Sequence, residues 1–239
     1  MEAKTAWTAS RRQFLRQGSA LAAAAALLGP AHLVAAEQKA AAEVGVTPTE
    51  DLMREHGVLR RIMLLFDDFG TRLQSTADFP LEALTQATKI IRTFIQDYHE
   101  QDEELQIFPS FAKAGKMMDL LKVLLAQHRA GRKVIAAVEA QATPASLKGP
   151  AGREKIRGLL ASFNRMYRPH AAWEDTVLYP AFRSVISPKE FDALGDNFED
   201  NEQKLFGKDG FEKIVAEVAG LEKQLGLYDL SQFTPKVQL

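Results

Sequence analysis

The chain contains no cysteine among its 239 residues. This absence excludes disulfides, thiolate metal ligands and cysteine nucleophiles. An excess of either charge is also missing, because 30 basic side chains stand against 31 acidic ones. A nucleic-acid-binding domain usually carries a basic patch or stripe, so we expect no nucleic-acid partner. The hydrophobic share of 46% is nevertheless sufficient for a packed core.

Residues 1–36 are predicted to be a secretory signal. Two adjacent arginines in the segment Ser10–Arg16 precede an apolar run, Ala20–Leu28, and small residues up to Ala36. This run is too short to span a bilayer, and its S-R-R-x-F-L-R start resembles the twin-arginine export motif. We therefore expect cleavage after Ala36, a linker over residues 37–46 and a periplasmic protein without a membrane span. The alternative is an amphipathic or disordered N-terminus.

Four later segments carry apolar residues at steps of three and four, which predicts four amphipathic helices. The first begins at Thr47-Pro48 and ends before Asp78-Phe79-Pro80; Pro109 and Gly115 end or kink the second. No segment shows the alternation typical of a strand. We predict an all-α, up-down-up-down four-helix bundle over residues 47–183. A C-terminal helical extension over residues 184–239 is expected to pack outside it or to pair with another copy.

A repeated pattern of histidine and glutamate links the two halves of the predicted bundle. Residues 99–111 and 170–182 share an initial histidine, a glutamate four positions later, and an aromatic-Pro-x-Phe ending. Another histidine precedes each segment by a similar interval, 43 residues from His56 to His99 and 42 from His128 to His170. The chain is thus predicted to contain two similar helical hairpins.

The spacing of these residues points to a metal site. Residues four apart lie on one helix face, so each His-x-x-x-Glu pair can address a common centre on the bundle axis. Burying the carboxylates unpaired among leucine, isoleucine and phenylalanine would cost several kcal/mol each, which a bound cation offsets. Nitrogen and oxygen ligands without sulfur favour iron, with manganese or zinc as alternatives. Two histidine pairs with Glu103 and Glu174 between them suit two bridged ions.

The pattern resembles the hemerythrin-like (HHE cation-binding) family over about residues 48–182. The resemblance implies a non-haem di-iron centre with these ligands: His56, His99, Glu103, His128, His170 and Glu174. Oxygen-carrying hemerythrins have a fifth histidine where this chain has Arg132, and an aspartate at the spacing of Asp175. In these respects the sequence is closer to hemerythrin-like proteins linked to iron sensing or to nitric-oxide stress and iron-centre repair.

Residues flanking the motifs leave alternatives open. Glu100, Glu104 and Asp175 are expected on a solvated face, with an additional metal ligand as the alternative and Glu100 as the first candidate. Tyr98 and Tyr167 are expected in the core or rim, or as hydrogen-bond or electron donors to the site. Arg60 and Arg132 follow His56 and His128 by four residues. They are either partners of the bridging carboxylates or surface charges.

We expect an exported di-iron protein that binds a small diatomic ligand, oxygen or nitric oxide, or that senses or stores iron. No catalytic residue and no organic cofactor is predicted. One alternative is a di-iron oxidoreductase acting on oxygen, peroxide or nitric oxide with an electron donor, or an iron-centre repair protein. Another is a bundle with a structural metal, in which the Phe-rich fifth helix binds a partner or a second copy.

Overall fold

The computed structural model describes residues 46–237. The predicted signal peptide and all but the last residue of the predicted linker lie outside them. Within the described range the chain forms helices, turns and loops but no strand, and Pro48–Leu239 is one compact unit. The predicted all-α fold is therefore confirmed.

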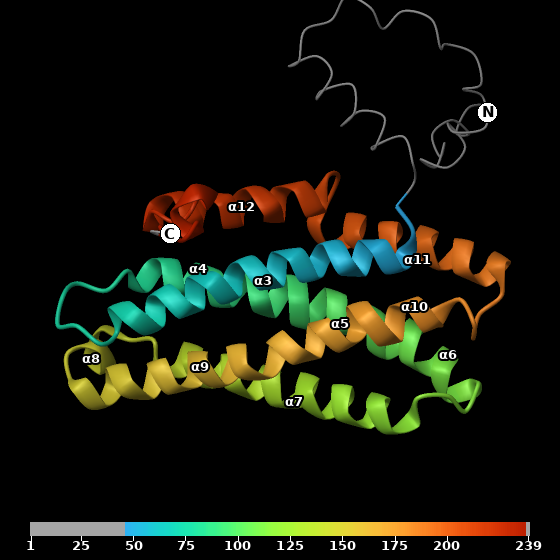
Figure 1. Cartoon of the computed structure of the whole chain (residues 1–239), viewed down its shortest axis with the longest axis horizontal. Coiled ribbons are helices and arrows are strands. Elements are labelled where there is room, and N and C mark those ends of the chain that lie inside the picture. The colour runs from blue at the N-terminus through green and yellow to red at the C-terminus, as the bar shows by residue number, and fades with distance from the viewer. Residues whose placement is uncertain (1–45, 238–239) are drawn as a thin grey trace, which may run out of the picture. The chain divides into compact units, whose positions relative to one another are not determined.

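Four helical segments lie side by side and form the bundle (Figure 1). The first is α3 (Pro48–Arg72) and the third is α7 (Met118–Gln141). The second is composed of α4 (Leu81–Ile90), η1 (Ile91–His99), α5 (Glu100–Asp102), η2 (Glu103–Ile107) and α6 (Phe108–Lys113). The fourth follows α8 (Pro144–Leu147) and comprises α9 (Pro150–Trp173), η3 (Glu174–Leu178) and α10 (Tyr179–Phe182). Short connections reverse the chain after each segment, giving the up-down-up-down order.

Local signals in the sequence set several helix boundaries. α3 begins at Pro48, whose fixed backbone angle suits the first helical turn. The loop before α7 contains Gly115 and Met117, both with positive φ, which lets the chain turn back within four residues. Ser187 and Glu190 form a capping box at the start of the helix Pro188–Phe206, where each side chain satisfies a backbone group of the other.

The second and fourth segments contain π-helical turns next to a proline. The second segment continues past Pro109 to Lys113 and ends before Gly115, and the fourth continues past Pro180 to Phe182. Proline lacks an N–H group and clashes with the carbonyl of residue i−4, so it disfavours an ordinary α-helical turn, although α9 contains Pro169 within its span. The wider turns η2 and η3 precede the two prolines and begin at Glu103 and Glu174. Such π-bulges often occur at functional sites.

The C-terminal helices pack on the outside of the bundle. α11 (Pro188–Phe206) and α12 (Gly210–Leu225) lie along α3, and η4 (Leu230–Phe233) follows them (Figure 1). Arg61 donates two hydrogen bonds to the carboxylate of Glu222, at 2.8 and 2.6 Å, and so links α3 to α12. Phe191 and Phe198 of α11 are buried against the end of the bundle. These phenylalanines are therefore not available as the partner-binding surface that one reading of the sequence assigned to this helix.

Two apolar clusters occupy the interior. The larger, around Phe66, Phe94 and Phe163, fills the bundle toward α4 and α8. The smaller, around Phe111 and Phe182, lies near α6, α10 and α11. A group of buried polar side chains lies in the helical segments between the two clusters, so the bundle core is divided by a polar layer.

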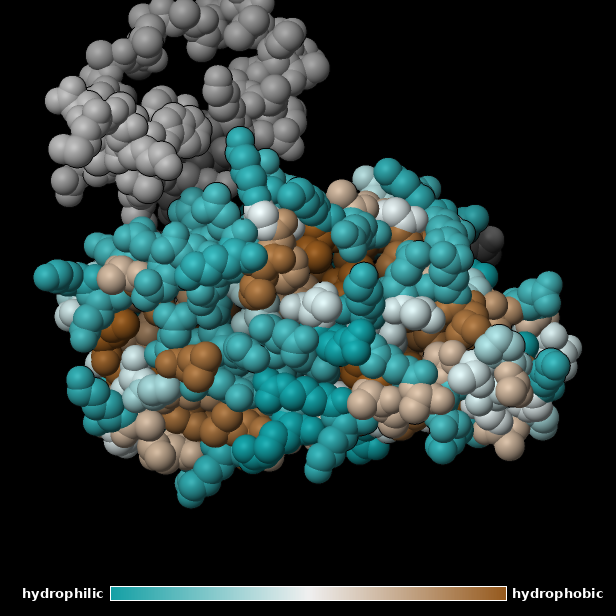
Figure 2. All heavy atoms as spheres, turned by 180° about the vertical axis from the view of Figure 1, so that it is seen from behind, coloured by the Kyte–Doolittle hydropathy of each residue, from teal (hydrophilic) through white to brown (hydrophobic). Residues whose placement is uncertain are grey.

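The surface carries both polar and apolar side chains. Figure 2 shows polar side chains over most of one face, with separate apolar patches between them. Among the described helices, none combines the length and the apolar character needed to cross a membrane.

Candidate metal centre

All six residues predicted as metal ligands meet in the polar layer of the bundle. Each of the four helical segments supplies at least one of them, and the side chains are between 0 and 3% exposed. The contributions are His56 from α3, His99 and Glu103 from the second segment, His128 from α7, and His170 and Glu174 from the fourth segment. The repeat found in the sequence thus forms one shared centre rather than two separate sites.

The histidines form two pairs, one from each hairpin. The Nε2 atoms of His56 and His99 are 3.1 Å apart, and those of His128 and His170 are 3.2 Å apart. The two glutamates lie between these pairs. Glu103 Oε2 is 3.6 Å from His99 Nε2 and 3.4 Å from His128 Nε2.

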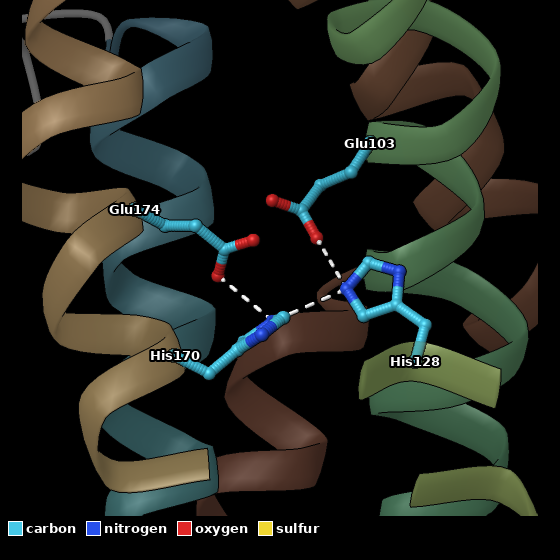
Figure 3. A group of neighbouring side chains, drawn as sticks. All are labelled: Glu103, His128, His170 and Glu174. Atoms are coloured by element: carbon cyan, nitrogen blue, oxygen red, sulfur yellow. Dashed lines mark hydrogen bonds and ion pairs between the residues drawn. The ribbon is translucent and has the colours of Figure 1, made fainter. Parts of the chain in front are cut away.

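Glu174 occupies the corresponding position on the other side of the centre. Its Oε2 atom is 3.3 Å from His56 Nε2 and 3.1 Å from His170 Nε2. Figure 3 shows that Glu103, His128, His170 and Glu174 point toward one another, and each offers a ligand atom within 4.8 Å of the others. Both carboxylates are thus placed to bridge the two histidine pairs.

The outer nitrogen of each of the four histidines in the centre has a hydrogen-bond partner. His99 Nδ1 lies 2.6 Å from Glu55 and His56 Nδ1 lies 2.7 Å from Asp175. The other hairpin repeats the arrangement with different residues, since His128 Nδ1 lies 2.9 Å from Glu104 and His170 Nδ1 lies 2.9 Å from Gln127. A proton on Nδ1 leaves the lone pair of Nε2 directed into the centre, as in histidine metal ligands.

Two arginines hold the outer carboxylates in place. Arg60 pairs with Asp175, and Arg132 pairs with Glu104 at 2.9 Å. Glu104 and Asp175 were expected on a solvated face, but both hold a histidine of the centre. The arginines contact these outer carboxylates and not the two bridging ones.

Glu100 is buried beside the centre instead of facing solvent. It receives a hydrogen bond of 2.5 Å from Tyr167 and forms an ion pair of 2.8 Å with Arg132. Tyr167 can approach because residue 131 is glycine: a Cβ there would lie 2.0 Å from the tyrosine hydroxyl. Of the two tyrosines considered from the sequence, Tyr98 packs in the core against Phe94 and Phe206.

A third tyrosine, which sequence reasoning missed, contacts a bridging carboxylate directly. The hydroxyl of Tyr179 donates a hydrogen bond of 2.8 Å to Glu103 Oε1, and its ring stacks on His56. The repeat places Phe108 at the matching position, where its ring stacks on His128. The aligned aromatic-Pro pairs of the repeat were the signal in the sequence that could have identified these stacking residues.

The interior of the centre has unmatched acceptor atoms. Glu103 Oε2 and both oxygens of Glu174 are buried without a hydrogen bond from any described residue. Where histidine Nδ1 carries the proton and donates outward, Nε2 is also an acceptor, so carboxylate oxygens and imidazole nitrogens face each other. Buried polar atoms without partners are costly. This set of carboxylate oxygens and imidazole nitrogens therefore fits metal cations, to which all these atoms would coordinate.

The pKa values show how the chain distributes charge within the centre. Burial and the neighbouring charge of Glu103 raise the pKa of Glu174 to about 8. Burial also opposes ionisation of Glu103, but His99 and His128 outweigh it and lower the pKa of that carboxyl. Desolvation of its buried ring lowers the pKa of His128, but the neighbouring carboxylates of Glu103 and Glu104 outweigh desolvation and raise the pKa to about 10. Positive charge at the centre is thus stabilised by the surrounding carboxylates.

Comparison with known proteins agrees with this geometry. The hemerythrin HHE cation-binding domain family matches residues 47–181 and, in a second alignment, residues 119–205, which begins in the second hairpin. Uncharacterised proteins of Mycobacterium bovis and of two strains of Mycobacterium tuberculosis are 47% identical over 193 residues, covering 81% of this chain and 76% of theirs. No solved structure matches the chain. On the family match and the hairpin repeat, the chain belongs to the hemerythrin HHE cation-binding family.

Proposed function

We propose that the centre binds two iron ions between the histidine pairs. The ligands would be His56, His99, Glu103, His128, His170 and Glu174, with both glutamates bridging. The observation that carries this proposal is the convergence of four Nε2 atoms and two carboxylates in a buried layer, where Glu103 Oε2 and both oxygens of Glu174 lack donors. A sulfur-free set of imidazoles and carboxylates suits iron, although manganese and zinc accept the same atoms.

We further propose that the protein binds a small diatomic ligand, oxygen or nitric oxide. A non-haem di-iron centre supplies reversible ligation and one-electron redox chemistry. The chain surrounds its centre with apolar clusters and leaves each of the six side chains at most 3% exposed, which favours a diatomic ligand over a large substrate. The outer carboxylates, amide and arginines would keep the six ligands oriented during ligand exchange.

Anaerobic iron loading followed by ligand addition tests the assignment. Nitric oxide or oxygen should change the optical and electron paramagnetic spectra, and evacuation should restore them if the protein is a reversible binder. Consumption of the ligand with an oxidised product would instead support the di-iron oxidoreductase. Iron binding without any response to either gas would contradict small-ligand binding and favour iron storage or sensing. The Trp173→Ala protein is a matched control, because this side chain is more than half exposed.

Export by the twin-arginine route remains part of the proposal. The supporting feature is the twin-arginine string followed by a short apolar run in residues 1–36. Replacing Arg11 and Arg12 by lysine should retain the protein in the cytoplasm of a host that possesses the pathway. Unchanged periplasmic accumulation of the double variant would contradict the proposed route.

A further inference from the structure

The repeat places an aromatic ring against the first-helix histidine of each hairpin, and these two rings differ by one hydroxyl group. Phe108 stacks on His128 with ring centroids 5.7 Å apart and planes at 18°. Tyr179 stacks on His56 at 5.6 Å and 24°. Each aromatic residue belongs to one hairpin and its histidine to the other, so the two contacts correspond. The two aromatic residues are 3% and 1% exposed, so the tyrosine hydroxyl lies inside the bundle.

The hydroxyl of Tyr179 makes the two bridging glutamates unequal. It donates a hydrogen bond of 2.8 Å to Glu103 Oε1, which leaves Oε2 as the one oxygen of that carboxylate without a partner among the described residues. Neither oxygen of Glu174 receives a hydrogen bond from a described residue. Phe108 occupies the position that corresponds to Tyr179, but its ring has no hydroxyl to donate. Two carboxylates that the repeat makes equivalent therefore differ in their number of unpaired oxygens.

The unpaired oxygens face the histidines of both hairpins. Glu103 Oε2 lies 3.6 Å from His99 Nε2 and 3.4 Å from His128 Nε2. Glu174 Oε2 makes the corresponding contacts at 3.3 and 3.1 Å, and its Oε1 is a further buried acceptor. The two carboxylates face each other in Figure 3. Because an unpaired buried acceptor is costly, cations would have two oxygens to satisfy on Glu174 but one on Glu103.

We propose that Tyr179 is a positioning residue that restricts Glu103 to one metal-binding oxygen, Oε2, while Glu174 bridges the two ions with both oxygens. This inference rests on the proposed binding of two ions. Hydrogen bonds to a ligating carboxylate orient it toward the metal. A carboxylate that withholds one oxygen leaves a coordination position open, which a metal centre needs in order to bind a small ligand. Tyr179 thus places the ligand position on the Glu103 side of the centre.

Infrared difference spectra of the protein with and without zinc test the assignment in the absence of iron and of redox chemistry. The asymmetric and symmetric carboxylate stretches are further apart when one oxygen binds a metal than when two oxygens bridge two metals. Wild-type protein should show one carboxylate of each kind, which the Glu103→Gln and Glu174→Gln variants assign. In Tyr179→Phe the one-oxygen pattern of Glu103 should change to the bridging pattern.

Zinc affinity and a reciprocal variant supply readouts that a purely structural role would not move. In metal-free Tyr179→Phe, Glu103 Oε1 loses its donor, and zinc would satisfy it. Competition with a chelator should therefore give zinc binding about tenfold tighter than in wild type. Phe108→Tyr adds a hydroxyl at the position that corresponds to Tyr179, and it should change Glu174 to the one-oxygen pattern. The control Tyr228→Phe, at a residue that is 53% exposed, should behave like wild type.

Nitric oxide binding to the iron-loaded proteins connects this coordination to the small ligand. Tyr179→Phe should bind nitric oxide more weakly than wild type, because the released oxygen of Glu103 would occupy the open position. Two bridging patterns in wild-type protein, or an unchanged spectrum and zinc affinity in Tyr179→Phe, would overturn the inference and leave a two-ion centre intact. An iron(III)–phenolate absorption band that Tyr179→Phe lacks would also overturn it, because the hydroxyl would then be a ligand. Wild-type protein that cannot bind two ions would instead overturn the proposed function.

Discussion

Replacing Glu174 by glutamine tests how strongly the centre disfavours the ionised form of this buried carboxyl group. In the metal-free protein burial raises the pKa of this group from 4.5 to about 8. A raised folded-state pKa contributes stability that is lost as pH increases toward it, because the unfolded chain releases its proton first. Between those two values the free energy of unfolding falls by about 1.4 kcal/mol per pH unit. Between pH 6 and pH 8, allowing for partial ionisation at the upper limit, the loss is about 2 kcal/mol.

Urea denaturation of chelator-treated protein, followed by circular dichroism, measures this difference. Wild-type protein should lose about 2 kcal/mol more stability between pH 6 and pH 8 than the Glu174→Gln variant. His128, whose pKa rises to about 10, also reduces stability over this range in both proteins, so the difference between them reports Glu174 together with its interaction with His128. Glu217→Gln, at an exposed position, should follow the wild-type profile. Parallel pH profiles for wild type and Glu174→Gln would refute the reasoning.

Three further perturbations have defined outcomes. Gly131→Ala should destabilise the protein by about 1–3 kcal/mol, because the new Cβ would lie 2.0 Å from the Tyr167 hydroxyl. The control Gly158→Ala, whose Cβ would meet no atom within 4 Å, should not destabilise the protein. Thermal denaturation compares the two variants. Tyr179→Phe should cost about 1–3 kcal/mol in urea denaturation by leaving Glu103 Oε1 without its donor; a loss below a few tenths of a kcal/mol would contradict this. A free metal concentration of about 100 times its Kd should add about 2.7 kcal/mol per site to the free energy of unfolding. Calorimetry should therefore show a higher Tm that a chelator reverses. An unchanged Tm would contradict metal binding to the folded state.

The bundle and the six central residues could be predicted from the sequence because both depend on periodicity. Apolar steps of three and four placed the helices, and the repeated His-x-x-x-Glu spacing placed Glu103 and Glu174 on the faces directed inward. The matching intervals from His56 to His99 and from His128 to His170 indicated that the hairpins share one centre. The structure brings these residues together within hydrogen-bonding or ion-pairing distance.

The hydrogen bonds to the outer nitrogens of these histidines could not be predicted in the same way. Glu55 and Gln127 adjoin His56 and His128, but neighbouring helical residues point about 100° apart, so periodicity places them off the central face. Their contacts depend on how closely the next helix packs. Asp175 was misplaced for the same reason, since the π-helical turn that begins at Glu174 alters the direction of the side chains that follow.

Iron content per chain tests the central claim most directly. The mature protein, purified from a host that exports it, should contain two irons, and the His99→Ala/His170→Ala double variant should lose them while Trp173→Ala retains them. Because this double variant removes one imidazole from each hairpin, it affects both proposed positions. One zinc ion per chain, or a folded wild-type protein without metal, would contradict a di-iron centre.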